Sequence, residues 1–220
     1  MSSPVIQLLV LAAIAIFLIL RLRDVLGTRE GFEKPAVTRK TSDRESQRGN
    51  FEVIEGGPDP DIVDHVDEGT SAANALSAMK IVEPSFNVGE FLGGARGAYE
   101  MILMAFEAGD LAKIQPFLSE DVYESFAAVV EARNEKGLTI EADFVGLREL
   151  KLVDAEFDTD TNEAEITVRF IGEQTSVVRD KSGEIVEGNP KEVKRQKDTW
   201  TFAREMGSNN PNWLLVATGG

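Results

Sequence analysis

The sequence contains no cysteine and a single histidine, His65. The lack of cysteine excludes disulfides, thiolate catalysis and cysteine-type zinc sites, and it fits a reducing compartment. His65 lies among Asp61, Asp64 and Asp67 in a polar stretch, where we expect a solvated side chain rather than a metal ligand. We expect no cofactor and no metal, because no phosphate-cradling loop, metal-ligand spacing or nucleophile elbow is present.

Positive charge is also scarce, with 23 Lys and Arg against 38 Asp and Glu, for a net charge of −15. Residues 21–50 carry +3, residues 51–84 carry −7 and residues 85–220 carry −11. Non-specific nucleic-acid binding depends on neutralising phosphates, so this composition excludes nucleic acid as a partner. Only the short basic stretch after residue 20 is expected to lie close to anionic lipid heads.

One long apolar run is present, at residues 5–20, which read VIQLLVLAAIAIFLIL. As a helix these sixteen residues extend about 24 Å, and flanking arginine stems can supply the missing length of a bilayer core. We therefore predict a single-span membrane anchor over residues 1–24. Its predicted anchoring residues are Val5, Leu8, Leu11, Ile14, Phe17, Leu20, Arg21 and Arg23.

Two other interpretations of this run fit less well. A secretory signal peptide has positive charge before its apolar region, whereas here Arg21, Arg23 and Arg29 follow it. A buried core helix would need a partner close by, but the next forty or so residues are polar. Lys and Arg flanking a span stay on the side of insertion, so we expect the N-terminus outside and residues 21–220 in the cytoplasm or on a mitochondrial matrix face.

Residues 25–84 are rich in Gly, Pro, Ser, Thr and charges, and their apolar residues follow no long period. This composition predicts a flexible linker. Two pieces of it are candidates for order: residues 51–54 as an extended stretch, and residues 72–81 as a helical turn or two.

From residue 85 the pattern is that of one folded domain, 85–220. Apolar residues recur at three-and-four spacing after Asn87, which with Glu90 has the form of a helix cap, and Gly109 is placed to end that helix. Helices are predicted over 88–108, from 110 to about 117, and from 119 to 137. Strands are predicted over 139–144, 147–157, 164–178, 191–204 and 213–218.

Helices followed by an antiparallel meander predict an α+β fold in which helices cover one face of a curved sheet. Such a cone can leave an apolar pocket at its mouth, able to take a lipid tail or a hydrophobic peptide side chain. Most of the large aromatic residues are expected in the core, with some lining this pocket: Tyr99, Phe106, Phe126, Phe144, Trp200, Phe202 and Trp213. Gly94, Gly97 and Ala98 leave space along the first helix, and Gly93 with Gly94 is expected to allow close packing.

Two polar features have alternative explanations. Asp143 with Tyr99 could form an acid–base pair inside the cone, as in a dehydratase or isomerase, but we expect Asp143 to face solvent. The basic residues Lys191, Lys194, Arg195 and Lys197 form a candidate contact for a partner or a lipid head. Pairing with Glu163 and Glu165 on a neighbouring strand is the structural alternative.

Several strings resemble one known family. They are RLRDVLGTREGFEKP after the span, FLGGARGAYEMILMAFEAGDLAKIQPFLSEDVYESF at 91–126, DTWTF at 198–202 and PNWLL at 211–215. These resemble the TimA family, the bacterial relatives of the mitochondrial inner-membrane translocase subunit Tim44. The resemblance implies the fold of nuclear transport factor two and a non-enzymatic adaptor at the inner face of the inner membrane.

The implied partners are proteins of translocation or membrane-protein assembly. The mitochondrial relative has a long N-terminal region in place of this span and linker, so chaperone recruitment is not implied. A structural subunit of a type IV secretion apparatus is a third class, but its cone lies outside the membrane, which the basic flank after the span argues against.

Overall fold

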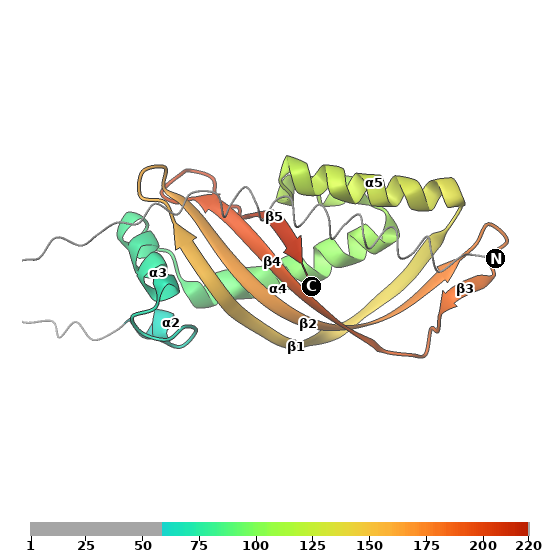
Figure 1. Cartoon of the computed structure of the whole chain (residues 1–220), viewed down its shortest axis with the longest axis horizontal. Coiled ribbons are helices and arrows are strands. Elements are labelled where there is room, and N and C mark those ends of the chain that lie inside the picture. The colour runs from blue at the N-terminus through green and yellow to red at the C-terminus, as the bar shows by residue number, and fades with distance from the viewer. Residues whose placement is uncertain (1–58, 220) are drawn as a thin grey trace, which may run out of the picture. The chain divides into compact units, whose positions relative to one another are not determined.

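The structure is a computed structural model that describes residues 59–219 (Figure 1). The predicted span at residues 5–20, its flanking arginines and linker residues 25–58 lie outside the described residues. Within residues 59–219, no helix is both long enough and apolar enough to cross a membrane.

The described part of the chain begins with two helices, α2 (Pro60–Val63) and α3 (Ser71–Val82). The linker predicted over residues 25–84 is therefore wrong for most of residues 60–82. Within this range, only the helical turn or two expected at residues 72–81 agrees with the structure, where α3 forms.

Helix α3 forms because it has a cap and one apolar face. The Thr70 hydroxyl accepts a hydrogen bond of 3.2 Å from the Ala73 amide, and Leu76 and Met79 are fully buried against the rest of the domain. The alanines and serines of this segment made it resemble a linker in composition, although its buried residues Ala72, Ala73, Leu76 and Met79 follow a helical spacing.

Helix α4 (Val88–Ala108) confirms the predicted helix over 88–108. The Asn87 side chain accepts from the Glu90 amide at 2.8 Å, and Gly109 ends the helix at φ 75°. The short helix expected from residue 110 is instead two 3₁₀ turns, η1 (Leu111–Lys113) and η2 (Gln115–Phe117). Helix α5 (Glu120–Lys136) lies between the predicted caps Ser119 and Gly137.

The sheet is antiparallel, with strand order β1-β2-β4-β5 and the short β3 paired to the end of β2. Its strands are β1 (Thr139–Phe157), β2 (Glu163–Arg179), β3 (Ile185–Gly188), β4 (Lys194–Glu205) and β5 (Leu214–Gly219). The two strands predicted over 139–157 are one, with register shifts between Phe144 and Gly146, Leu147 and Glu149, and Leu152 and Asp154. Strand β3 was not predicted.

The long strands bow around α4, and α5 lies on the same side of the sheet (Figure 1). Alternate residues of β2 are buried on the helix-facing side, including Ile166, Val168 and Phe170, each with no exposed surface. Tyr99 and Ile102 of α4 meet them in one core. The predicted α+β arrangement of helices on a curved antiparallel sheet is confirmed.

Candidate functional site: a groove along helix α4

A groove of about 600 Å³ runs along the side of α4 that faces away from the core. It is bounded by the loop between α3 and α4, by η2, by the end of β4 and by the loop before β5. These segments come from the whole length of the described domain, so the groove exists only in the folded chain.

The floor of the groove is the small-residue face of α4, formed by Gly93, Gly94, Gly97 and Ala98. A methyl group placed on any of these three glycines would meet no heavy atom within 4 Å of the new carbon. The close packing expected at Gly93 and Gly94 is therefore absent among the described residues. Each glycine inside a helix lowers the stability of the fold by roughly 1 kcal/mol relative to alanine. The three glycines therefore destabilise α4 while leaving this face open.

The walls are aromatic. The Trp213 ring lies with its centroid 4.7 Å from that of Phe91 and 6.0 Å from that of Phe86. Phe91 also meets Phe202 edge to face at 6.0 Å. Phe86 and Phe91 flank the Asn87 cap at the two positions of a hydrophobic staple, which fixes how the chain enters α4. That spacing is the sequence signal from which these two wall residues could have been found.

The rim is polar and is fixed by Arg204. Its Nη2 lies 2.5 Å from Glu83 Oε2, its Nη1 donates to the Pro211 carbonyl at 3.3 Å, and its guanidinium lies 5.2 Å from the centre of the Trp213 ring. Burial alone would raise the pKa of Glu83, but hydrogen bonds from Arg204 and from the Gly207 amide outweigh it and hold the pKa below its usual range.

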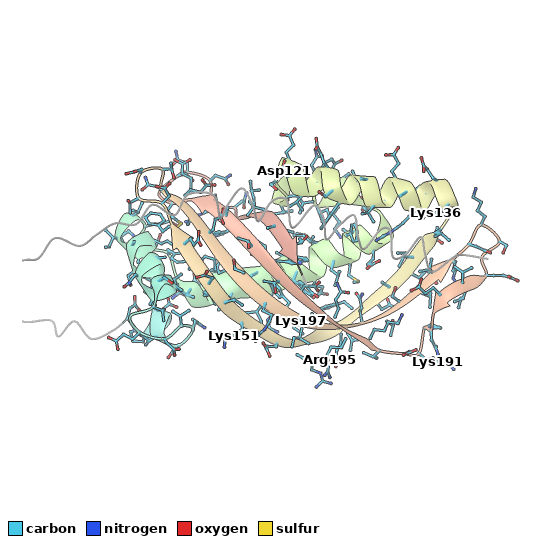
Figure 2. The ribbon with its side chains drawn as sticks, viewed as in Figure 1. Asp121, Lys136, Lys151, Lys191, Arg195 and Lys197 are labelled. Carbon is cyan, nitrogen blue, oxygen red and sulfur yellow. The ribbon has the colours of Figure 1, made fainter. Side chains whose placement is uncertain are left out.

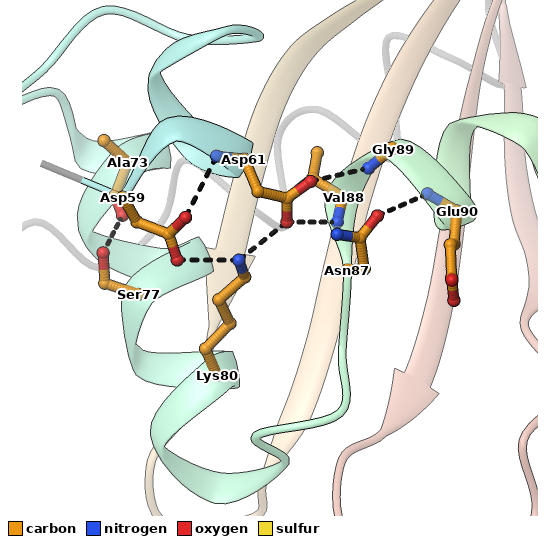
Figure 3. A network of polar contacts seen from close by, with 9 residues as sticks. All are labelled: Asp59, Asp61, Ala73, Ser77, Lys80, Asn87, Val88, Gly89 and Glu90. Atoms are coloured by element: carbon orange, nitrogen blue, oxygen red, sulfur yellow. Dashed lines mark hydrogen bonds and ion pairs between the residues drawn. The ribbon is translucent and has the colours of Figure 1, made fainter.

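The start of α4 is anchored by Asp61 of α2 (Figure 3). Its carboxylate accepts from the amides of Val88 at 2.8 Å and Gly89 at 3.1 Å, and it lies 2.7 Å from Lys80 Nζ. Burial opposes ionisation here too, yet these contacts lower the pKa of Asp61 and raise that of Lys80, which also pairs with Asp59. The positive end of the α4 dipole adds to the same effect.

Of the seven aromatic residues predicted to line a pocket, Phe202 and Trp213 line the groove. The other five do not. Phe144 and Trp200 instead meet Tyr99 against the core, where Tyr99 also stacks on Phe170 at 4.4 Å.

Phe106 and Phe126 form a separate pair between α4 and α5, with ring centroids 4.5 Å apart. Arg133 covers it with its guanidinium 4.4 Å from the centre of the Phe106 ring. These two residues join the helices and lie away from the groove.

The alternative acid–base pair does not form. Asp143 is exposed, because its neighbour Phe144 turns toward Tyr99 and successive side chains of a strand point to opposite faces. Tyr99 instead donates a 2.5 Å hydrogen bond to Asp198 Oδ2. Burial, followed by this contact with Asp198, raises the pKa of Tyr99, so the phenol stays protonated.

The predicted basic residues Lys191, Lys194, Arg195 and Lys197 are exposed, and the register of β2 and β4 does not support the alternative of pairing with Glu163 and Glu165. The register places Glu163 opposite Glu205 and Glu165 opposite Ala203. Arg195 lies opposite Glu173, which also pairs with Arg148 at 2.8 Å. Figure 2 shows Arg195 and Lys197 on the outer side of the sheet, with Lys151 nearby.

His65 is half-buried beside the start of α4 rather than solvated in a linker. Among residues 59–219, no group of three or more His, Asp or Glu side chains is arranged to hold a metal ion. The chemistry available at the groove is thus apolar contact with a polar rim.

A family model described as the Tim44-like domain matches residues 72–220, which agrees with the resemblance noted in the sequence. The human "Mitochondrial import inner membrane translocase subunit TIM44" is 25% identical over 150 residues, covering 67% of this chain and 33% of that protein. The chain thus spans about a third of the length of this relative.

Two solved structures are similar in part. The intermembrane space region of the chloroplast protein ARC6 has 12% identity and a TM-score of 0.38, over 66% of this chain and 94% of that one. An NTF2-like protein of unknown function in nutrient uptake from Rhodospirillum rubrum has 19% identity and a TM-score of 0.27, over 55% of this chain and 91% of that one.

Proposed function

Because this chain belongs to the Tim44-like domain family, we propose that it is a non-enzymatic adaptor in protein translocation or membrane-protein assembly. The name of the human relative, a translocase subunit, supports this role for the shared domain. The proposal concerns the domain alone, since the chain spans only 33% of that relative.

The groove along α4 is where this adaptor binds its partner. Its open glycine floor and aromatic walls suit apolar side chains of a protein segment, and the Glu83–Arg204 rim suits the polar backbone around them. The observation that carries the proposal is the floor itself, where three helical glycines face empty space.

We also propose that residues 5–20 anchor the chain in the inner membrane, with the N-terminus outside and the domain on the cytoplasmic or matrix face. The uncharged run and the arginines that follow it support this topology. Protease added outside intact cells should then leave a C-terminal tag uncut, and should cut it after the cells are opened. Cutting in intact cells would reverse the topology.

A photocrosslinking amino acid tests the groove directly. Placed at Asn212, an exposed residue that lines the groove away from its glycine floor, benzoylphenylalanine in the full chain should crosslink to proteins of the translocation or assembly machinery. The matched position is Ala128, which is exposed on α5. Identical adducts at both positions, or adducts with lipid alone at Asn212, would contradict a protein-binding groove.

A further inference from the structure

One edge of the sheet is uncovered where β4 begins. Strand β2 pairs with β4 as far back as Lys194, but β5 pairs with β4 only from Thr199 to Ala203. Residues 194–198, here called the open edge, therefore have a neighbouring strand on one side alone among the described residues. About half of their backbone N–H and C=O groups point outward, as in any edge strand.

The open edge is held in extended form by side chains that point toward α4. Asp198 accepts from Tyr99 at 2.5 Å and from Gln196 Nε2 at 2.9 Å. Gln174 Nε2 in turn donates to Gln196 Oε1 at 3.3 Å. Because this chain of contacts ties β4 to α4 and β2, a strand added here would meet a backbone that is already ordered.

The open edge is basic in a domain that is otherwise acidic. Lys194 and Lys197 are exposed and make no ion pair with any residue between 59 and 219. Arg195, with its side chain 66% exposed, shares the single carboxylate of Glu173 with Arg148. Figure 2 shows Arg195 and Lys197 projecting from the sheet into solvent, with Lys191 further along the same side.

We propose that the open edge binds an extended acidic segment of a partner protein, which adds to the sheet as a strand in line with β5. The backbone groups supply the pairing, and the three basic side chains select negative charge. A second copy of this chain fits poorly, because antiparallel pairing centred on Gln196 would place Arg195 opposite Lys197 twice. An anionic bilayer would match the charge but would leave the strand unpaired.

A labelled peptide of sequence TEVEVET tests both features of the edge with the full 220-residue chain in detergent micelles. It should bind, measured by fluorescence anisotropy, and slow amide hydrogen exchange within residues 194–198. The same peptide N-methylated at alternate residues keeps its charge but cannot pair, so its Kd should rise at least about tenfold. Lys194→Glu with Lys197→Glu should raise the Kd by about tenfold as well, whereas the exposed Lys113→Glu should change it less than about twofold.

Three results would overturn the proposal. Equal binding of the N-methylated peptide would show that charge alone attracts it. Slower exchange at residues 194–198 in nanodiscs containing phosphatidylglycerol, without peptide binding, would assign the edge to the membrane. Dimerisation of the Lys194→Glu, Lys197→Glu variant, again without peptide binding, would show that the lysines only prevent self-association. Gly94→Leu, which fills the groove, should leave peptide binding unchanged and so separates this edge from the groove.

Discussion

Glu83 and Arg204, 121 residues apart in the sequence, form an ion pair that joins the end of α3 to β4. The Arg204 side chain is only 8% exposed and that of Glu83 is 23% exposed. The same carboxylate accepts from the Gly207 amide at 3.0 Å. The pair therefore makes α3 part of the domain and fixes one end of the groove.

Replacing Glu83 with Gln should lower the free energy of unfolding by about 1 to 3 kcal/mol at pH 7, because it leaves a buried guanidinium without its charged partner. Urea denaturation of the two proteins measures the difference. Glu90→Gln is the matched control, since Glu90 lines the same groove but is exposed, and it should change stability by less than about 0.5 kcal/mol. Equal losses in the two variants would contradict a specific role for the pair.

The contribution of Glu83 should also depend on pH. Its pKa in the folded state lies below the ordinary 4.5, so its contribution is fully present above that pH and is lost as the pH falls through the folded-state value. The stability gap between the wild-type chain and Glu83→Gln should therefore be constant from pH 7 to about 5 and should narrow toward pH 3. A gap that widens on acidification would mean that the pKa of Glu83 is raised rather than lowered.

Asp61→Asn should destabilise the domain by about 1 to 2 kcal/mol, because Asp61 holds both the first amides of α4 and the Lys80 ammonium. Thermal unfolding followed by circular dichroism measures the loss. Asp64→Asn provides the control, since Asp64 is exposed and its side chain has no hydrogen bond or ion pair within residues 59–219. If Asp64→Asn destabilised the domain as much as Asp61→Asn, the loss would come from the general reduction in charge rather than from the contact with α4.

Most of the fold could be predicted because its signals are local. Asn87 and Gly109 mark the ends of α4, and Ser119 and Gly137 mark those of α5. The alternation of buried and more exposed side chains along β2 can also be predicted from the sequence. Helix α3 was expected only as a helical turn or two within a linker, because half of its buried residues are alanines and the strand that it packs against, β1, begins nearly sixty residues later.

The site was harder to predict, because a side chain in a groove wall and one in the core look the same in a sequence. Trp213 and Tyr99 are both aromatic residues in predicted elements, yet only Trp213, which lies just before β5, reaches the groove. Ion pairs across strands depend on register, which no local pattern supplied for Arg195 and Glu173. The glycines on α4 were visible, but whether they face a neighbour or empty space is decided by tertiary packing.

Gly172→Ala should destabilise the core by about 1 to 3 kcal/mol, since the added methyl carbon would lie 2.8 Å from Tyr99 Oη and 3.1 Å from its Cε1. Tyr99 cannot move aside freely, because it is bonded to Asp198 and stacked on Phe170. Urea denaturation should show a smaller cost for Gly172→Ala in a Tyr99→Phe background, where the closest contact is gone. Additive losses would show that Tyr99 Oη is not what excludes the methyl group.

Gly93→Ala, Gly94→Ala and Gly97→Ala should each stabilise the domain by about 0.5 to 1 kcal/mol, because alanine favours the helix and the new methyl groups meet no neighbour. Chemical denaturation measures this gain. If the open floor exists for a partner, crosslinking through the groove should fall as the protein becomes more stable, and most strongly for Gly94→Leu. Ala128→Leu on exposed α5 is the control, which should leave crosslinking unchanged. If the variants are more stable but crosslink as well as the wild-type chain, the partner does not contact this face of α4. If the variants are less stable, these glycines are needed for packing within the chain.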